Sequence, residues 1–416
     1  MRILGYFVSA LLISTLTCGC AFARIPDQER QALLVLYDAT GGQNWKERYG
    51  WTGAPGTECT WTGIVCGNGD TTVEAIELPY NHLVGAIPAL AGLPNLLTLT
   101  LSGNELTGVV PPLGGLPSLQ IVYLSDNQLS GSIPAFDGST RLQTLALARN
   151  QLSGGVPAFA MSSLESLDLA DNALSGDIPS FDALPNLRYV HMARNRLTGQ
   201  IPPLNLLSRL EQMDLSGNQL SGTVPALDGL AVLHDMNLSN NGLTGPVPSL
   251  AGLAFLRLLD LSSNQLTGSI PSLNGLANLQ ELYLQENQLS GSIPPLQGLD
   301  SLGVLYLYDN RLTGAIPPLE GLRRLYYLDL SYNQLSGAIP ALNYPIGLLS
   351  IVRLSHNRLS GAVSDPASGL YSGESELCPN FLEATPNAAW DAATGVTPWY
   401  RDCDTQKIFS DGFEAR

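Results

Sequence analysis

The chain has 416 residues, of which only 13% are charged, and its 36 acidic and 20 basic side chains give a net charge of −16. This acidic balance argues against nucleic acid and anionic membrane surfaces as partners, because both attract basic proteins. A basic partner is compatible with it. The 42 glycines and 28 prolines would suggest disorder in an aperiodic chain, but here a 23-residue period accounts for them, and the chain is expected to form one elongated domain.

Residues 1–23 are predicted to form a secretory signal peptide. Arg2 is the charged start, residues 3–16 form the apolar core, and residues 21–23 form an A-x-A cleavage site. Lipidation at Cys20 is the alternative, although the leucine usual three residues before the cysteine is missing. No other stretch approaches the roughly 18 apolar residues of a membrane-spanning helix. We therefore expect a secreted or cell-surface protein, with a periplasmic protein or an outer-membrane lipoprotein as variants.

Residues 24–72 are predicted to form an N-terminal cap. Asp27 as N-cap, an apolar face and a glycine stop after Thr40 predict one short helix. Three tryptophans follow it, and they are Trp45, Trp51 and Trp61. They could form a carbohydrate platform, but we interpret them as core, because the first coil of a solenoid has an open apolar end to cover.

Residues 73–364 repeat the frame L-x-x-L-x-L-x-x-N-x-L-x-G-x-[IV]-P. Its asparagine returns every 23 residues, apart from one interval of 22 and one of 24. Such a period is typical of a solenoid, and this frame is that of leucine-rich repeats. The sequence therefore predicts an α/β solenoid, a right-handed superhelix with a concave parallel β-sheet and about 13 repeats of 23 residues.

The asparagine of the frame is expected where the chain leaves the strand. Its amide both donates and accepts, so it can satisfy main-chain groups that the turn would leave unpaired. Repeated through the array, these side chains predict a structural ladder rather than ligand contacts. The first and last members are Asn81 and Asn357, and those between are Asn104, Asn127, Asn150, Asn172, Asn195, Asn218, Asn241, Asn264, Asn287, Asn310 and Asn333.

The L-x-G-x-[IV]-P segment resembles the plant-specific class of leucine-rich repeats, which implies a second short sheet beside the first. The convex return is one residue shorter than is usual in that class, so we expect loops or 3₁₀ turns there. The C-x-W-x-G-[IV]-x-C motif from Cys59 to Cys66 resembles the N-terminal cap of this class, and the segment from Ala32 to Trp45 resembles the cap of its bacterial and protist members.

Over about residues 27–363 the chain is therefore similar to receptor-kinase ectodomains and to polygalacturonase-inhibiting proteins, as a bacterial secreted member of the group. This resemblance implies protein binding but no particular ligand.

From Asp365 to Asp404 the period is lost, and residues 365–404 are predicted to form a loop-rich C-terminal cap closed by a disulfide. Residues 405–416 are expected to be a detached tail. Its I-F-x-D-G-F-E ending is similar to one on exported proteins of some Gram-negative bacteria, where a sorting or processing signal is one interpretation.

Four cysteines remain after signal-peptide cleavage, and they allow three pairings. One pair precedes the array and one follows it, which favours Cys59–Cys66 and Cys378–Cys403. Disulfides fit an oxidising compartment. A zinc site is the alternative, but the spacing lacks close C-x-x-C pairs and nearby histidines.

Catalysis finds little support in the residues. The four histidines fall in different coils, and no H-E-x-x-H, G-x-S-x-G or P-loop motif occurs. Acidic residues on adjacent coils could form a carboxylate pair for glycoside hydrolysis. An open concave sheet, however, offers no pocket that excludes water. We therefore predict a non-enzyme without cofactor or metal.

The outward positions of the concave sheet are where binding is expected. Four residues before each asparagine, aspartate recurs in several coils, and tyrosines gather in the later coils. Tyrosine offers contact area with a polar tip and is enriched at interfaces. The candidate ligand-binding residues are Tyr283, Tyr306, Tyr308, Tyr327, Asp329, Tyr332, Asp260 and Asp214.

The leading hypothesis from the sequence is an exported, non-catalytic protein that binds a protein or peptide, with basic character, on its concave face. Inhibition of a secreted hydrolase such as a polygalacturonase is a sharper variant. A structural or adhesive cell-surface protein is the alternative that lipidation of Cys20 would favour.

Overall fold

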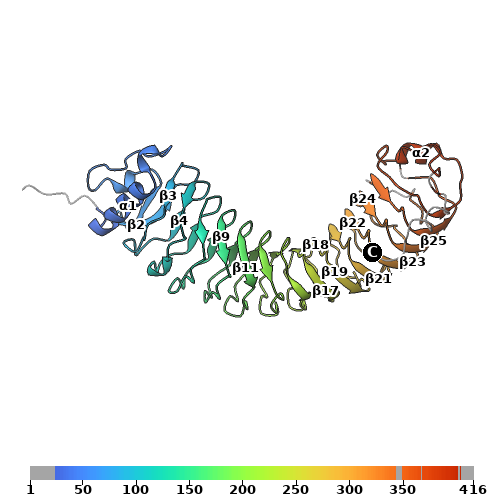
Figure 1. The fold of residues 1–416 in the computed structure, drawn as a ribbon, viewed down its shortest axis with the longest axis horizontal. Helices are drawn as coiled ribbons and strands as arrows, with labels where there is room; N and C mark the ends of the chain where they lie inside the picture. Colours follow the sequence, from blue (N-terminus) through green and yellow to red (C-terminus); the bar gives the residue numbers. More distant parts are fainter. Residues whose placement is uncertain (1–23, 343–348, 367, 402, 404–416) are drawn as a thin grey trace, which may run out of the picture.

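A computed structural model describes residues 24–342, 349–366, 368–401 and 403, and it shows a curved solenoid (Figure 1). The predicted signal peptide, the lipidation alternative at Cys20 and the predicted tail lie outside the described residues. Strands of the main sheet, such as β18, β22 and β24, lie on the inner side of the arc, and β17, β21 and β25 lie toward its outer side.

The main sheet has fourteen strands, and the strands of successive coils lie side by side in it. Its strands are β1 (Ile64–Gly67), β2 (Thr72–Glu77), β4 (Thr98–Thr100), β6 (Ile121–Tyr123), β8 (Thr144–Ala146), β10 (Ser166–Asp168), β12 (Tyr189–His191), β14 (Gln212–Asp214), β16 (Asp235–Asn237), β18 (Leu258–Asp260), β20 (Glu281–Tyr283), β22 (Val304–Tyr306), β24 (Tyr327–Asp329) and β26 (Ile351–Arg353). All neighbours are parallel except β1 and β2. The predicted parallel-sheet solenoid of about 13 coils is confirmed.

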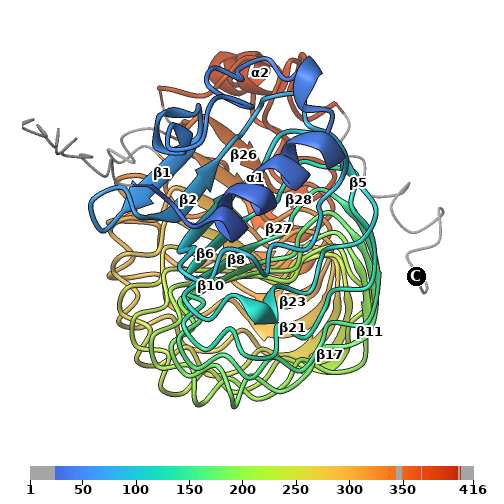
Figure 2. The same cartoon turned by 90° about the vertical axis from the view of Figure 1, so that its left-hand side faces the viewer.

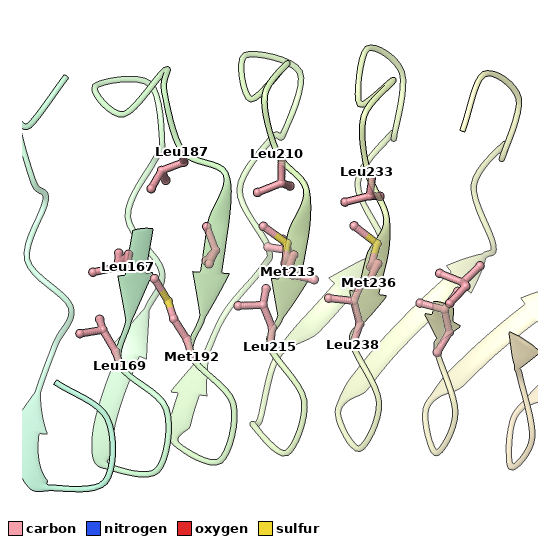
Figure 3. Packing of buried hydrophobic residues seen from close by; sticks show 14 of the residues in the cluster. Leu167, Leu169, Leu187, Met192, Leu210, Met213, Leu215, Leu233, Met236 and Leu238 are labelled. Atoms are coloured by element: carbon pink, nitrogen blue, oxygen red, sulfur yellow. The ribbon is translucent and has the colours of Figure 1, made fainter. Parts of the chain in front are cut away.

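The leucines of the frame explain this stacking. In each three-residue strand of this sheet, from β4 to β26, the central side chain is buried and its two neighbours lie on the opposite face, as the period of two requires. The buried residues of all coils form one continuous core. Figure 3 shows its middle, where Met192, Met213 and Met236 occupy positions that leucine fills in other coils. No coil buries its apolar side alone, so register between coils is set by this shared core.

A ladder of asparagine side chains joins the coils. In Asn218, Nδ2 donates to the carbonyls of Met192 and Leu215, both at 3.0 Å, and Oδ1 accepts from the N–H of Leu197 at 3.0 Å. The asparagines from Asn104 to Asn357 repeat these bonds from coil to coil, as Asn310 does, whereas the side chain of Asn81 bonds to the backbone of Glu47 in the cap. Each side chain thereby satisfies backbone groups of its own coil and of the preceding one.

The residue just before each ladder asparagine is left-handed, with φ between 51° and 71° in every coil. Glycine occupies this position only at Gly103 and Gly217. Elsewhere L-residues as large as Arg194 and Tyr332 adopt the conformation, which costs about 1–2 kcal/mol per residue in isolation. The ladder bonds on either side of the position hold it there.

A second set of strands flanks the main sheet, in three pieces. The first piece holds β3 (Val84–Ala86) and β5 (Glu105–Thr107). The second holds β7 (Ser130–Gly131), β9 (Gln151–Gly154), β11 (Ala173–Asp177) and β13 (Arg196–Thr198). The third holds β15 (Ser221–Thr223), β17 (Gly242–Pro246), β19 (Gln265–Gly268), β21 (Gln288–Ser292), β23 (Arg311–Gly314), β25 (Gln334–Gly337), β27 (Arg358–Gly361) and β28 (Phe381–Leu382).

The convex returns are turns, together with one 3₁₀ segment, η3 (Leu113–Gly115), in the described part of the array. This agrees with the expectation from their length.

The N-terminal cap places helix α1 (Asp27–Ala39) across the end of the first coil (Figure 2). Two short 3₁₀ segments follow, η1 (Gly42–Asn44) and η2 (Glu58–Thr60). The expectation that Asp27 is the N-cap is wrong. Pro26 takes the cap position without a side-chain bond, and Asp27 lies in the first turn, where its charge complements the helix dipole.

A buried carboxylate joins this cap to the array. Glu29 is 2% exposed, and it accepts hydrogen bonds from the Thr72 hydroxyl and the Val73 N–H, each at 2.7 Å. The three tryptophans are buried and pack edge to face or tilted against one another, as cap core does. The disulfide Cys59–Cys66 is present as predicted.

The C-terminal cap contains helix α2 (Ala388–Thr394), capped by the side chain of Asn387, and the disulfide Cys378–Cys403, also as predicted. The period does not end at Asp365 as expected. Asn380, 23 residues after Asn357, makes the ladder bonds to the Leu354 and Leu377 carbonyls and the Leu359 N–H. Neither α1 nor α2 has the length and apolar character needed to cross a bilayer, and the described residues contain no other α-helix.

Candidate functional site

The aspartates of the concave face hold turns. In Asp260, Oδ1 accepts from the N–H of Ser262 at 3.0 Å and from its hydroxyl at 2.6 Å. Asp214 makes the same pair of bonds with Ser216, and Asp329 makes it with Ser331. Asp329 is only 6% exposed. The acidic row of the sequence is therefore largely a row of local D-L-S turns, and burial raises the pKa of the Asp260 and Asp329 carboxyls.

Four of the candidate tyrosines come together, three of them on β20, β22 and β24 and the fourth, Tyr308, two residues after the end of β22. The ring of Tyr306 lies 5.2 Å from that of Tyr283, 6.1 Å from that of Tyr308 and 4.7 Å from that of Tyr327, measured between centroids. We call these four residues the aromatic patch. Their edge-to-face and tilted contacts are those that aromatic pairs prefer.

Tyr332 is not part of this cluster. It follows β24 and stacks on His356, with ring centroids 4.0 Å apart and planes 10° from parallel. Among the described residues no ring contact joins it to the four tyrosines of the patch.

Two glutamates are hydrogen-bonded to the patch. The Tyr283 hydroxyl donates to Glu281 Oε2 at 2.8 Å, and the Tyr308 hydroxyl donates to Glu286 Oε1 at 3.2 Å. Ser263 donates to the other oxygen of Glu286 at 2.6 Å. Burial and the neighbouring Glu286 raise the pKa of Tyr308 to about 12, so the phenol stays a hydrogen-bond donor at neutral pH.

The patch lies in coils that depart from the repeat pattern at one position. Two residues before the ladder asparagine, every coil from Ser102 to Ser355 has serine or alanine, except at Gln285 and Tyr308. Large polar side chains at these two positions do not serve the D-L-S turn. Local departures of this kind are expected at functional sites. Gln285, which the sequence reasoning missed, has a buried Oε1 without a hydrogen-bond partner in the described ranges.

Arg353 is the cation in contact with the patch, and it too was missed. Its guanidinium carbon lies 5.6 Å from the ring centroid of Tyr327. Its Nη2 is 3.4 Å from a carboxylate oxygen of Glu374 in the C-terminal cap. The signal for it was available, because Arg353 occupies the same row of the sheet, two coils after Tyr306 and one coil after Asp329.

The middle coils carry a different arrangement, with their concave charges paired. Arg188 donates to Glu211 Oε1 from Nε at 2.9 Å and from Nη2 at 2.6 Å. The Tyr189 hydroxyl donates to Glu211 Oε2 at 2.9 Å. One step along, Arg257 Nη2 donates to Asp235 at 2.9 Å.

Coils of this frame on one concave parallel sheet define a leucine-rich repeat solenoid. A model described as "Leucine Rich repeats (2 copies)" matches residues 94–138, 162–206 and 255–298, and one described as "Leucine Rich Repeat" matches residues 209–229 and 324–342. A search of curated proteins found no matching sequence.

Three solved structures place the chain within that class. The Arabidopsis receptor kinase HAESA, in complex with the peptide hormone IDA and the co-receptor SERK1, is 30% identical, with 88% of this chain and 68% of that chain covered and a TM-score of 0.68. A TDR receptor is 29% identical, with 74% and 55% covered and a TM-score of 0.70. The plant peptide hormone receptor RGFR1, in complex with RGF2, is 30% identical, with 81% and 63% covered and a TM-score of 0.60.

The chain belongs to the leucine-rich repeat family, in its plant type. It spans 55% of the TDR receptor chain and 63% of the RGFR1 chain, so what those whole receptors do is not carried over by the likeness alone. The proteins that it resembles are binding proteins and receptors.

Proposed function

We propose that this protein is an exported, non-catalytic binding protein that recognises a protein or peptide on its concave face, at the aromatic patch. The observation that supports the proposal most is the break in the D-L-S pattern at Gln285 and Tyr308, in the same coils that bring the tyrosines together. Tyrosine-rich surfaces supply large, rigid contact area with polar tips, which suits binding of another chain.

The similar structures support the same class of function. HAESA and RGFR1 are each seen with a peptide hormone or its named ligand. Those complexes belong to those receptors. For this chain, the similar structures favour a peptide or protein partner over a small molecule. The open form of its main sheet favours the same class of partner.

Charge supports a basic partner and argues against nucleic acid. The net charge is −16, and Glu281 and Glu286 lie beside the tyrosines. A partner segment with lysine or arginine would be steered toward this surface.

Export rests on the predicted signal peptide and is supported by the two disulfides and by the ectodomain character of the similar structures. The I-F-x-D-G-F-E ending, which is similar to one on exported proteins, also supports export.

Affinity capture with the mature protein tests the proposal. The Tyr306→Ala/Tyr308→Ala variant should bind the partner with a free energy weaker by about 2 kcal/mol or more, which is the loss expected when interface hot spots are truncated. This corresponds to about 30-fold in affinity. Tyr123→Ala is the matched control, because Tyr123 has the same frame position on β6 and is 40% exposed, outside the patch.

Unchanged melting temperatures would show that both variants fold. Equal recovery of one partner by the wild type and the double variant would move the binding site away from the patch.

A further inference from the structure

The middle coils show how this protein binds a guanidinium group. The Tyr189 hydroxyl donates to one carboxylate oxygen of Glu211, and Arg188 donates to the other. The guanidinium carbon of Arg188 lies 5.3 Å from the centroid of the Tyr189 ring. Ring face, phenol and carboxylate thus act together on one arginine, which combines a charge-assisted bond with a cation–π contact.

An aromatic ring and a carboxylate act on an arginine at two further sites, one near each end of the solenoid. Arg30 lies over Trp61 at 5.2 Å and pairs with Glu58, and Arg353 lies over Tyr327 at 5.6 Å beside Glu374. Each of these sites holds an arginine of the chain itself.

The aromatic patch has two tyrosine–glutamate pairs built on the same hydrogen bond. They are Tyr308 with Glu286 and Tyr283 with Glu281. In the described ranges no lysine or arginine lies within ion-pair distance of either glutamate. Glu286 is nonetheless held in place, because Ser263 of the preceding coil donates to its second oxygen at 2.6 Å. A carboxylate oriented in advance loses less entropy when a cation binds.

The chemistry of the Tyr308–Glu286 pair favours one kind of cation. Glu286 offers two acceptor oxygens, and the phenol of Tyr308 is hydrogen-bonded to one of them. A guanidinium carries five N–H donors in a planar fork, whereas an ammonium is a compact and strongly hydrated charge. A carboxylate beside an aromatic ring therefore favours the guanidinium.

We infer that the pair Tyr308–Glu286 binds the side chain of an arginine of the ligand, with Tyr283–Glu281 as a second position for a neighbouring cationic side chain. This inference rests on the proposed function and names the chemistry of its partner. It makes the proposed partner more specific, from a basic segment to an arginine side chain that contacts the Tyr308–Glu286 pair.

Fluorescence anisotropy with the full mature chain tests the inference. The probes are three fluorescein-labelled peptides with the sequence Gly-X-Gly-X-Gly, in which X is arginine, lysine or citrulline. Citrulline keeps the shape of arginine without its charge. The arginine peptide should bind at least tenfold more tightly than the citrulline peptide and at least threefold more tightly than the lysine peptide. Equal affinities of the arginine and lysine peptides would overturn the inference.

Matched variants separate the site from the overall charge. Glu286→Gln should weaken the arginine peptide at least tenfold, and Tyr308→Phe should weaken it less, because the ring remains. Glu77→Gln is the control, since it removes the same charge from an exposed position on β2 of the same sheet. Equal weakening by Glu77→Gln and Glu286→Gln would assign the binding to net charge and overturn the inference. Melting temperatures verify that each variant folds.

The two proposals fail separately. Suppose that the arginine peptide shows no preference for wild type over Glu286→Gln, while Tyr306→Ala/Tyr308→Ala still loses the captured partner. Then the arginine site is wrong and the aromatic patch remains the binding surface.

Discussion

Two stretches of the concave face differ in how their charged side chains are paired. In the coils of β12 to β18, charged side chains find partners on neighbouring coils, as Arg188 does with Glu211 and Arg257 with Asp235. In the coils of β20 to β24, glutamates are oriented by tyrosines and serine and have no cation of the chain within ion-pair distance, as far as the structure describes it. Glu211 and Asp235 of the first stretch pair with arginines of the chain, whereas Glu281 and Glu286 of the second do not in the described ranges, and the proposed site rests on this difference.

The comparison shows that composition alone does not locate the site. Both stretches are rich in carboxylates and contain tyrosine, and both rest on the same core and ladder. They differ in which side chains already have partners. The following variants test that difference, since a structural residue should matter equally in both stretches and a binding residue in only one.

The largest effect is expected from the ladder. Asn218→Ala in the middle coils and Asn310→Ala in the patch coils should each lower the free energy of unfolding by about 1–3 kcal/mol, because each leaves buried carbonyls and an N–H unpaired. Denaturation followed by circular dichroism measures the loss, with the exposed Asn205→Ala as control, expected within about 0.5 kcal/mol of wild type. No loss for Asn218→Ala, or a loss in only one stretch, would contradict a ladder common to both.

A smaller gain is expected at the border between the stretches. Asn237 makes with Ser239 the bonds that Asp260 makes with Ser262, so Asp260→Asn keeps the turn and removes a buried charge. The gain should be about 0.5–1 kcal/mol at neutral pH.

The pH dependence of this gain follows from the pKa of Asp260, which burial raises above its ordinary value of 3.8. The contribution of the Asp260 carboxyl to the stability of the wild type is therefore fully present below that ordinary value, and it is lost as the pH rises through the raised pKa. The advantage of Asp260→Asn should grow over that window and then level off. Thermal melts between pH 3 and pH 7 measure it, and a constant or falling advantage would be incompatible with burial as the cause.

The smallest effect is expected from the exposed ion pairs of the middle coils. Arg194 pairs with Asp171 across one coil step, and Arg194→Ala should cost less than about 1 kcal/mol, because exposed pairs contribute little. The hydrogen bond from Arg194 lowers the pKa of Asp171 below its ordinary value of 3.8. This contribution is therefore present above that value and disappears as the pH falls through the lowered pKa. Binding of the arginine peptide should be unchanged, and a loss of binding would extend the site beyond the patch.

The repeating part of the fold could be predicted because the same sequence frame recurs thirteen times. The period places each leucine inside and each asparagine at the turn, and the cysteines that flank the array indicate their own pairing. Asn380 was missed although Leu377-x-x-Asn380-x-Leu382 keeps the frame at the same interval, since the surrounding cap sequence has lost the rest of the pattern. The left-handed position has no sequence signal in single coils, because side chains as different as Arg194 and Tyr332 occupy it.

The candidate site was predictable in part. Register puts Tyr283 and Tyr306 side by side, so their contact follows from the period. The role of the aspartates could have been found from the serine two residues later, which makes the D-L-S turn, as at Asp329 and Ser331. What no pattern supplies is the direction of a flexible side chain. That the Tyr308 hydroxyl turns toward Glu286, and that Gln285 Oε1 is left without a partner, depend on packing between coils.

The second sheet has breaks between β5 and β7 and between β13 and β15. Yet backbone hydrogen bonds continue across them, from the Ser130 N–H to the Gly108 carbonyl at 2.7 Å and from the Ser221 N–H to the Gly199 carbonyl at 2.8 Å. Each coil is therefore tied to the next on two sides, so a change in the curvature of the arc would have to stretch or compress both. The coils of β20, β22 and β24 all lie within the eight-stranded piece of the flank. A surface held on two sides is organised in advance, so a ligand of the four phenol rings would lose little free energy in ordering the coils beneath them.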